Sequence, residues 1–98
     1  MAKATDYMDD VKRYDAGADE NAIQKICNYL GVALLNKNAP LVSCSNEKER
    51  NRIRDGFCAK KLGMDTAAAE TAIEAVCQQM KGDKFKKRVT FYHLLTKQ

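Results

Sequence analysis

The chain has 98 residues, of which 45% are hydrophobic and 31% are charged, and its formal net charge is +4 at pH 7. This composition is that of an ordinary globular protein and excludes disorder over most of the length. The longest apolar runs, such as residues 32–35, are far shorter than the roughly 18 residues of a membrane-spanning helix. The first ten residues have no apolar signal-peptide core either, so we expect a cytoplasmic protein.

Charge is distributed unevenly along the chain. Residues 1–24 carry six acidic and three basic side chains, whereas residues 25–98 carry seven acidic and fourteen basic ones. The length is that of one domain. We therefore expect a single helical domain over residues 1–98, with an acidic N-terminal helix on the surface within residues 1–18 and the core in residues 19–98.

The first two helices are predicted from apolar spacing and capping residues. One should run from Thr5 to about Asp15 and stop before Gly17. Asp19 is a suitable N-cap for the second helix. The apolar face of this second helix follows the i, i+3, i+4 pattern and consists of Ile23, Ile26, Cys27, Leu30 and Leu34.

A loop and a long third helix should follow. The segment Asn36–Ser43 contains the chain's one proline, Pro40, and is predicted to be a loop whose last apolar residues pack into the core. Ser45 is a suitable N-cap for a helix that reaches Leu62, with Gly63 directly after its end.

A fourth helix is expected to begin at Asp65 or Thr66 and to stop at Gly82. Its apolar stripe consists of Ala69, Ile73, Val76 and Met80. Asp83 would then cap the last helix.

The last helix, Lys84–Lys97, has the widest apolar surface. On a helical wheel its large apolar side chains cover an arc of roughly 220°, so we expect the other helices to surround it. Its basic start should project from the body. Only a narrow strip is left to face water, and this strip consists of Lys86, Thr90, His93 and Lys97.

No segment shows sustained period-two alternation, and none repeats another. The pattern therefore predicts an all-α fold, a compact single-domain bundle of about five helices with a largely buried C-terminal helix.

The chain has four cysteines, and three of them fall within helical patterns. A cytosolic protein keeps such thiols reduced, so we expect four free thiols. Their spacing matches no zinc pattern. We therefore expect no metal and no cofactor.

Cys44 is the candidate for thiol chemistry, because it precedes the expected N-cap and a helix start stabilises a thiolate. Ser43 and Ser45, with the free amides of the same helix start, are candidate anion-binding groups. Packing and capping are the more common roles for such residues. His93, the one histidine, lies in another helix, so we assign no catalytic residue.

Basic side chains form a candidate contact surface for a polyanion. No aromatic residues alternate with them and no nucleic-acid-binding motif is visible, so a solvated basic face is the more common explanation. The aromatic residues themselves are interpreted as core or rim. The candidate basic surface consists of Arg50, Arg54, Lys61, Lys84, Lys86, Lys87 and Arg88.

Three stretches resemble a family of small bacterial proteins of unknown function. They are PLVSCSN at residues 40–46, KKLGMD at 60–65 and KKRVTFYHLL at 86–95. The resemblance implies a compact helical cytoplasmic domain with no established activity. The loop with Ser43, Cys44 and Ser45 is the nearest thing to a family site, and tyrosine is frequent at the position of His93.

These observations favour a non-enzymatic helical domain that binds another protein or a second copy of itself, with no membrane contact. We do not expect an enzyme, because no acid, base and nucleophile cluster in the sequence. The first alternative is binding of nucleic acid or another polyanion through the basic surface. The second is a thiol-based activity at Cys44.

Overall fold

The structure is a computed structural model that describes residues 3–31, 41–83 and 86–98. The described part of the chain is compact and measures 32 × 26 × 26 Å. It is mostly helical, so the predicted all-α class is confirmed, with one short two-stranded sheet in addition. In chain order the elements are η1 (Ala4–Asp6), α1 (Met8–Lys12), α2 (Glu20–Leu30), β1 (Leu41–Val42), α3 (Glu47–Ile53), η3 (Arg54–Lys61), α4 (Thr66–Gln79), β2 (Lys86–Lys87) and α5 (Arg88–Thr96).

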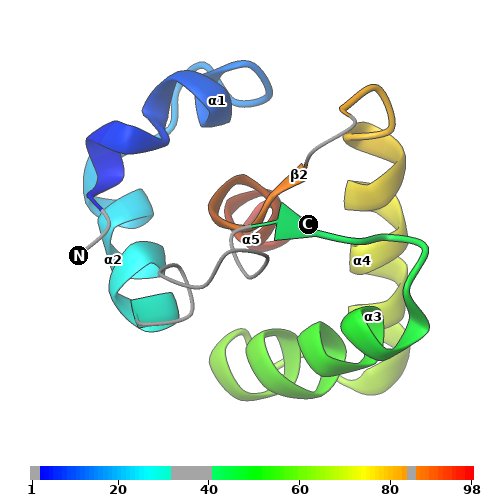
Figure 1. The fold of residues 1–98 in the computed structure, drawn as a ribbon. Helices are drawn as coiled ribbons and strands as arrows, with labels where there is room; N and C mark the ends of the chain where they lie inside the picture. Colours follow the sequence, from blue (N-terminus) through cyan, green and yellow to red (C-terminus); the bar gives the residue numbers. More distant parts are fainter. Residues whose placement is uncertain (1–2, 32–40, 84–85) are drawn as a thin grey trace.

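Helix α5 lies in the middle of the molecule, with α1 and α2 on one side and α4 on the other (Figure 1). Every residue from Arg88 to Leu95 is buried. The helix contacts α1, α2, α4 and β1. The prediction of a largely buried C-terminal helix is therefore confirmed. Burial of each large apolar side chain contributes roughly 1.5–3 kcal/mol, so this one helix supplies much of the core.

The start of α5 differs from the prediction. The helix begins at Arg88 rather than Lys84, and Lys84 lies outside the described residues. Lys86 and Lys87 form β2, which pairs antiparallel with β1 so that Val42 stands opposite Lys86. The basic run is thus partly buried and satisfies its backbone groups in a sheet instead of projecting from the body.

The polar strip of α5 is also placed differently. Thr90 and His93 are only 0% and 2% exposed, because the acidic N-terminal segment packs against them. Thr90 donates a hydrogen bond to Asp10 at 2.5 Å, and His93 Nε2 lies 2.8 Å from Asp15 Oδ2. The prediction that this strip faces water is therefore wrong for its two middle residues. Only Lys97, at its end, is exposed.

The capping predictions are confirmed for α2 and α4. Asp19 and Asp65 each accept a hydrogen bond from a backbone N–H of the first turn. The third helix is capped by Asn46 instead of Ser45, since the longer Asn46 side chain accepts from the backbone three residues on. Asp83 does not cap α5, because its carboxylate is bound by the N-terminal segment.

The first and third helices differ in detail from the predicted ones. The expected helix Thr5–Asp15 is divided into η1 and α1. The third helix does extend as predicted, but its second half, η3, is π-helical and ends before Gly63, whose φ is +67°. The predictions for Leu34 and for the loop residues 36–40 fall outside the described residues.

Within residues 3–31, 41–83 and 86–98, no helix combines the length and the apolar character that crossing a membrane requires.

Candidate functional site

The end of α2 presents an unusual side chain to solvent. Tyr29 is 44% exposed and is, within the described part of the chain, the large hydrophobic residue that lies open to water. Tyr29 lies at the edge of the buried face of α2, which contains Ile26. It follows the exposed Lys25 by one helical turn. An exposed tyrosine at the edge of an apolar face is a frequent feature of binding surfaces.

Tyr29 lies at a mainly apolar pocket of about 250 Å³, which we call the Tyr29 pocket. Helix α2, η3 with the residue after it, and α5 form its walls. Lysine side chains contribute to the walls from two different elements, one from α2 and one from η3. The lining residues are Ala22, Lys25, Ile26, Tyr29, Phe57, Lys61, Leu62, His93 and Thr96.

A row of aromatic rings connects this pocket with the core. The ring of Tyr29 meets Phe57 edge-on at 5.3 Å between centroids, and Phe57 packs on Tyr92 at 4.3 Å. Lys61 Nζ lies 5.8 Å from the centre of the Tyr29 ring, a cation–π geometry. Phe57 is only 3% exposed, so the inner edge of the Tyr29 ring packs against a buried side chain of the core.

His93 is the buried polar group of the pocket. Its Nε2 is bound to Asp15, and this hydrogen bond holds the pKa of the Asp15 carboxyl below its ordinary value. Its Nδ1 is buried and has no hydrogen-bond partner among the described residues. A buried polar nitrogen without a partner costs free energy.

The Tyr29 pocket contains few side chains that could serve in catalysis. The Thr96 hydroxyl, three residues after His93, donates to the His93 backbone carbonyl at 2.5 Å. Within the described residues, no three or more His, Cys, Asp or Glu side chains are placed to hold a metal ion.

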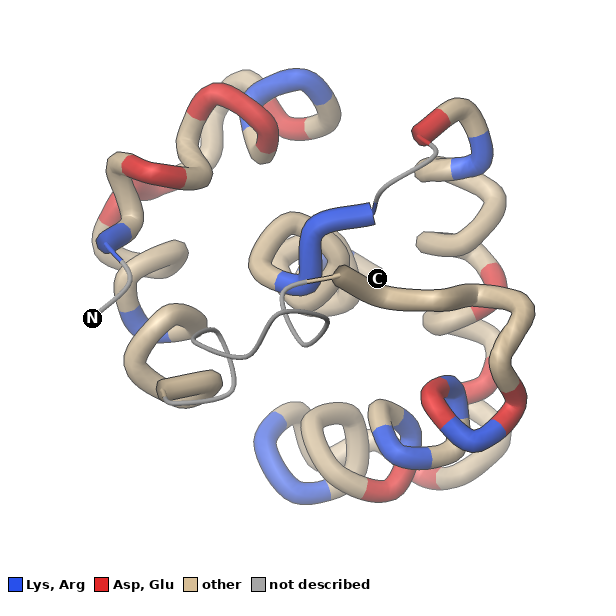
Figure 2. Tube along the Cα trace, viewed as in Figure 1, with Lys and Arg blue, Asp and Glu red and all other residues tan. Residues whose placement is uncertain are grey.

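The arginines of the candidate basic surface are paired with acids. Arg50 binds Glu74 at 2.7 Å, and Arg54 contacts Asp55 and a glutamate of α4. These contacts lower the pKa of the Glu74 and Asp55 carboxyls. Figure 2 shows that basic and acidic positions lie next to one another along α3 and η3.

Arg88 is buried rather than on the surface, at 8% exposure. It forms an ion pair with Glu49 and donates to the Leu41 carbonyl at 3.1 Å. Lys86 donates to the Asp83 carbonyl at 2.9 Å. Lys84 lies outside the described residues; of the other six, Arg88 is buried and Lys61 lines the Tyr29 pocket, so the described members do not form one open basic face.

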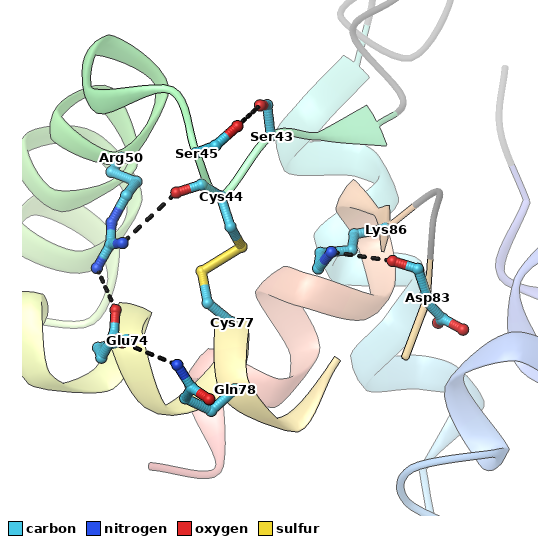
Figure 3. The surroundings of a disulfide bond; sticks show 9 residues. All are labelled: Ser43, Cys44, Ser45, Arg50, Glu74, Cys77, Gln78, Asp83 and Lys86. Atoms are coloured by element: carbon cyan, nitrogen blue, oxygen red, sulfur yellow. Dashed lines mark hydrogen bonds and ion pairs between the residues drawn. A yellow bond between two sulfur atoms is a disulfide. The ribbon is translucent and has the colours of Figure 1, made fainter. Parts of the chain in front are cut away.

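Cys44 is joined to Cys77 of α4 by a disulfide (Figure 3). The expectation of four free thiols is thus wrong for this pair. A link between positions 33 residues apart joins two elements that only the folded structure brings together. Ser43 and Ser45 lie on either side of Cys44, exposed, with their hydroxyl oxygens 3.3 Å apart.

A family model for a protein of unknown function, DUF2853, matches residues 6–98. The chain belongs to this family. The predicted resemblance to an uncharacterised family is confirmed, and the match includes the N-terminal segment as well. No curated protein and no solved structure matches the chain.

In this DUF2853 chain, sequence reasoning missed Tyr29 and the contact between Asp15 and His93. The sequence places Tyr29 at the boundary between the polar and apolar faces of its helix, because it follows both Lys25 and Ile26 by about one turn. The Asp15–His93 contact joins residues 78 apart and has no local signal. The sequence indicates this contact only through the opposite charges of the N-terminal segment and the last helix.

Proposed function

We propose that this chain is a non-enzymatic, cytoplasmic protein-interaction domain of a bacterial cell and that the Tyr29 pocket is its contact site. The partner is a protein that inserts one apolar side chain into the pocket and presents carboxylates beside it. The observation that carries the proposal is the exposure of Tyr29 beside a mainly apolar pocket with lysines in its walls.

The pocket supplies each part of such a contact. A volume of about 250 Å³ is at the small end for a drug-sized ligand and suits a single side chain. Lys25 and Lys61 are both exposed and offer ammonium groups to acids of the partner. Tyrosine buries a large area and loses few rotamers on binding, which makes it an effective anchor.

Two other functions, catalysis by the Asp15–His93 pair and polyanion binding, have less support. An enzyme that used the Asp15–His93 pair would need a nucleophile or bound water beside Nδ1, and the nearby Thr96 hydroxyl is engaged with its own helix. Polyanion binding would need arginines that can turn toward phosphates, whereas Arg50, Arg54 and Arg88 are held by carboxylates. The free thiols of Cys27 and Cys58 fit a reducing compartment, in which the Cys44–Cys77 disulfide would be open to reduction.

Photo-crosslinking in the cells of origin tests the proposal. A photoreactive amino acid at Ala22, on the wall of the pocket, should form a covalent adduct with one protein. The same group at the exposed Thr71 of α4, outside the pocket, is the matched control. We expect the adduct to disappear with Tyr29→Ser and to weaken with Lys25→Glu and Lys61→Glu.

Two outcomes would contradict the proposal. One is an adduct of equal yield in the Tyr29→Ser variant, since the pocket would then not be the contact. The other is an adduct with a second copy of the chain in place of another protein. Tyr29→Ser also removes the ring contact with Phe57, so we expect it to lower the free energy of unfolding by about 1 kcal/mol. Circular dichroism checks that the variant stays folded, so that loss of the adduct reports binding.

A further inference from the structure

The Cys44–Cys77 disulfide links the segment before α3 to the last turn of α4, with 6.0 Å between the two Cα atoms (Figure 3). Its two sulfur atoms have different surroundings. Cys77 belongs to the buried face of α4 and is 8% exposed. Cys44 lies in the connection between β1 and α3 and is only partly buried.

A surface groove of about 410 Å³ leads to the Cys44 side of this bond. Its walls come from the start of α3, from η3 and from α4, and include Arg50, Asn51 and Ile73. Cys44 is among the lining residues and Cys77 is not. A nucleophile in the groove therefore reaches Cys44 first.

The remaining thiols are poor participants in exchange. Cys27 and Cys58 are 2% and 0% exposed, and burial raises the pKa of both thiols above their ordinary value. A thiol that is protonated and out of contact with solvent neither attacks a disulfide nor accepts an alkylating reagent. Any thiol chemistry of the native chain is thus restricted to the Cys44–Cys77 pair.

We propose that the Cys44–Cys77 disulfide is a thiol-exchange site whose co-reactant is a small free thiol that enters the groove. The thiolate of the small molecule attacks Cys44 Sγ, on the side opposite Cys77. A new bond forms between the small thiol and Cys44, the Cys44–Cys77 bond breaks, and Cys77 leaves as a thiolate that takes a proton from water.

A second small thiolate completes the reduction. It attacks the small-molecule sulfur of the mixed disulfide, releases Cys44 as a thiolate and leaves as a small-molecule disulfide. Two electrons have then passed from two small thiols to the protein, which holds two thiols. The reverse sequence, with the small-molecule disulfide as oxidant, closes the bond again.

Reduction changes how the start of α3 is held. Without the disulfide, Arg50 still bridges this junction, since it reaches the Cys44 carbonyl at 3.5 Å and Glu74 at 2.7 Å. Arg50 and Glu74 are partly exposed, and exposed ion pairs stabilise proteins only slightly. On either side of Ser43 and Ser45, β1 stays paired with β2 and Glu49 stays paired with Arg88. The redox state of the pair therefore changes how tightly the segment between them is held to α4.

The test uses the full chain, oxidised, in native buffer with reduced glutathione as the probe. At intervals, exposed thiols are alkylated and mapped by mass spectrometry. We expect labelling of Cys44 and Cys77 together, with Cys27 and Cys58 unlabelled until denaturant is added. Because Cys58 is fully buried, its labelling reports global unfolding within the same sample. Labelling of the pair that appears only together with Cys58 would overturn the proposal, since the disulfide would then be purely structural.

A matched pair of variants identifies the sulfur that is attacked. Cys77→Ser leaves Cys44 as the partner of oxidised glutathione, and Cys44→Ser leaves Cys77. We expect the adduct on Cys44 in the first variant and at least about tenfold slower adduct formation on Cys77 in the second, because access limits exchange. Equal rates, in variants that circular dichroism shows to be folded, would contradict attack from the groove.

Discussion

His93 Nε2 lies 2.8 Å from Asp15 Oδ2 and joins the end of the N-terminal segment to the central helix α5. Next to it along the same face, Thr90 binds Asp10 at 2.5 Å. The acidic segment therefore covers the polar strip of α5 through matched hydrogen bonds, and its charge is complementary to the strip that it covers.

We expect His93→Ala to lower the free energy of unfolding by about 2–4 kcal/mol, because it removes a buried hydrogen bond and leaves a cavity. Urea unfolding at pH 7 measures the loss. Lys97→Ala is the control, since Lys97 Nζ is 3.8 Å from the same Asp15 carboxylate but largely exposed. The control should change stability by less than about 0.5 kcal/mol. Similar losses in both variants would mean that the His93 contact adds nothing.

Asp83 and Tyr14 form a contact whose two pKa shifts have opposite signs. Tyr14 and Arg13 both donate to the Asp83 carboxylate at 2.5 Å, which lowers the pKa of that carboxyl below 3.8. The unfolded chain then takes up the proton at a higher pH than the folded chain, so stability falls as pH drops below about 4. Burial, followed by the bond to Asp83, raises the pKa of Tyr14 to about 12 from 10.0. The unfolded chain loses that proton first, so stability also falls above pH 10.

Tyr14→Phe tests both limbs. At pH 7 we expect a loss of about 1–2 kcal/mol from the missing hydrogen bond. The difference in stability between wild type and variant should shrink toward pH 3 and again above pH 10, when measured by urea unfolding across the range. A difference that stays constant with pH would show that the Tyr14–Asp83 bond does not form.

Arg88 and Glu49 should be strongly coupled. Both side chains are nearly buried, at 10% and 11% exposure, and they form an ion pair. Arg88→Met leaves the Glu49 charge in a poorly solvated position, so we expect a loss of about 3–5 kcal/mol. The double variant with Glu49→Leu should lose less than the sum of the two single variants. Additive losses in such a thermal or urea series would argue against the pair.

Two glycines should respond to alanine in opposite directions. Gly63 has a φ of +67°, where a Cβ atom is strained, so Gly63→Ala should cost about 1 kcal/mol. Gly56 lies within η3, without a positive φ and with open space where a Cβ would stand. Gly56→Ala should therefore stabilise the chain by about 0.5–1 kcal/mol, because it restricts the unfolded state. Unfolding midpoints that move in the same direction would refute the argument.

Sequence patterns predicted the parts of the fold that depend on neighbouring residues. The Asp19 and Asp65 caps and the wide apolar arc of the last helix follow from local spacing, and all three are confirmed. Ser45 and Asn46 are adjacent and have similar N-cap propensities, so propensity alone does not predict which of them caps the third helix.

The candidate site depends on contacts that spacing does not reveal. Periodicity identified the strip with Thr90 and His93 as polar, but whether water or another polar segment covers a polar face is decided by the tertiary arrangement. The partners Asp10 and Asp15 are about 80 residues away. The same holds for Cys44 and Cys77, since four cysteines allow several pairings and an unpaired state.

The central position of α5 also has a consequence for synthesis of the chain. The helix that contacts α1, α2 and α4 is encoded last among the described elements, so the earlier helices emerge from the ribosome before their common packing partner exists. Their apolar faces stay open until residue 95 is made. Folding of this domain therefore completes only after α5 has been made, and a nascent chain stalled within α4 would expose these faces to chaperones and proteases.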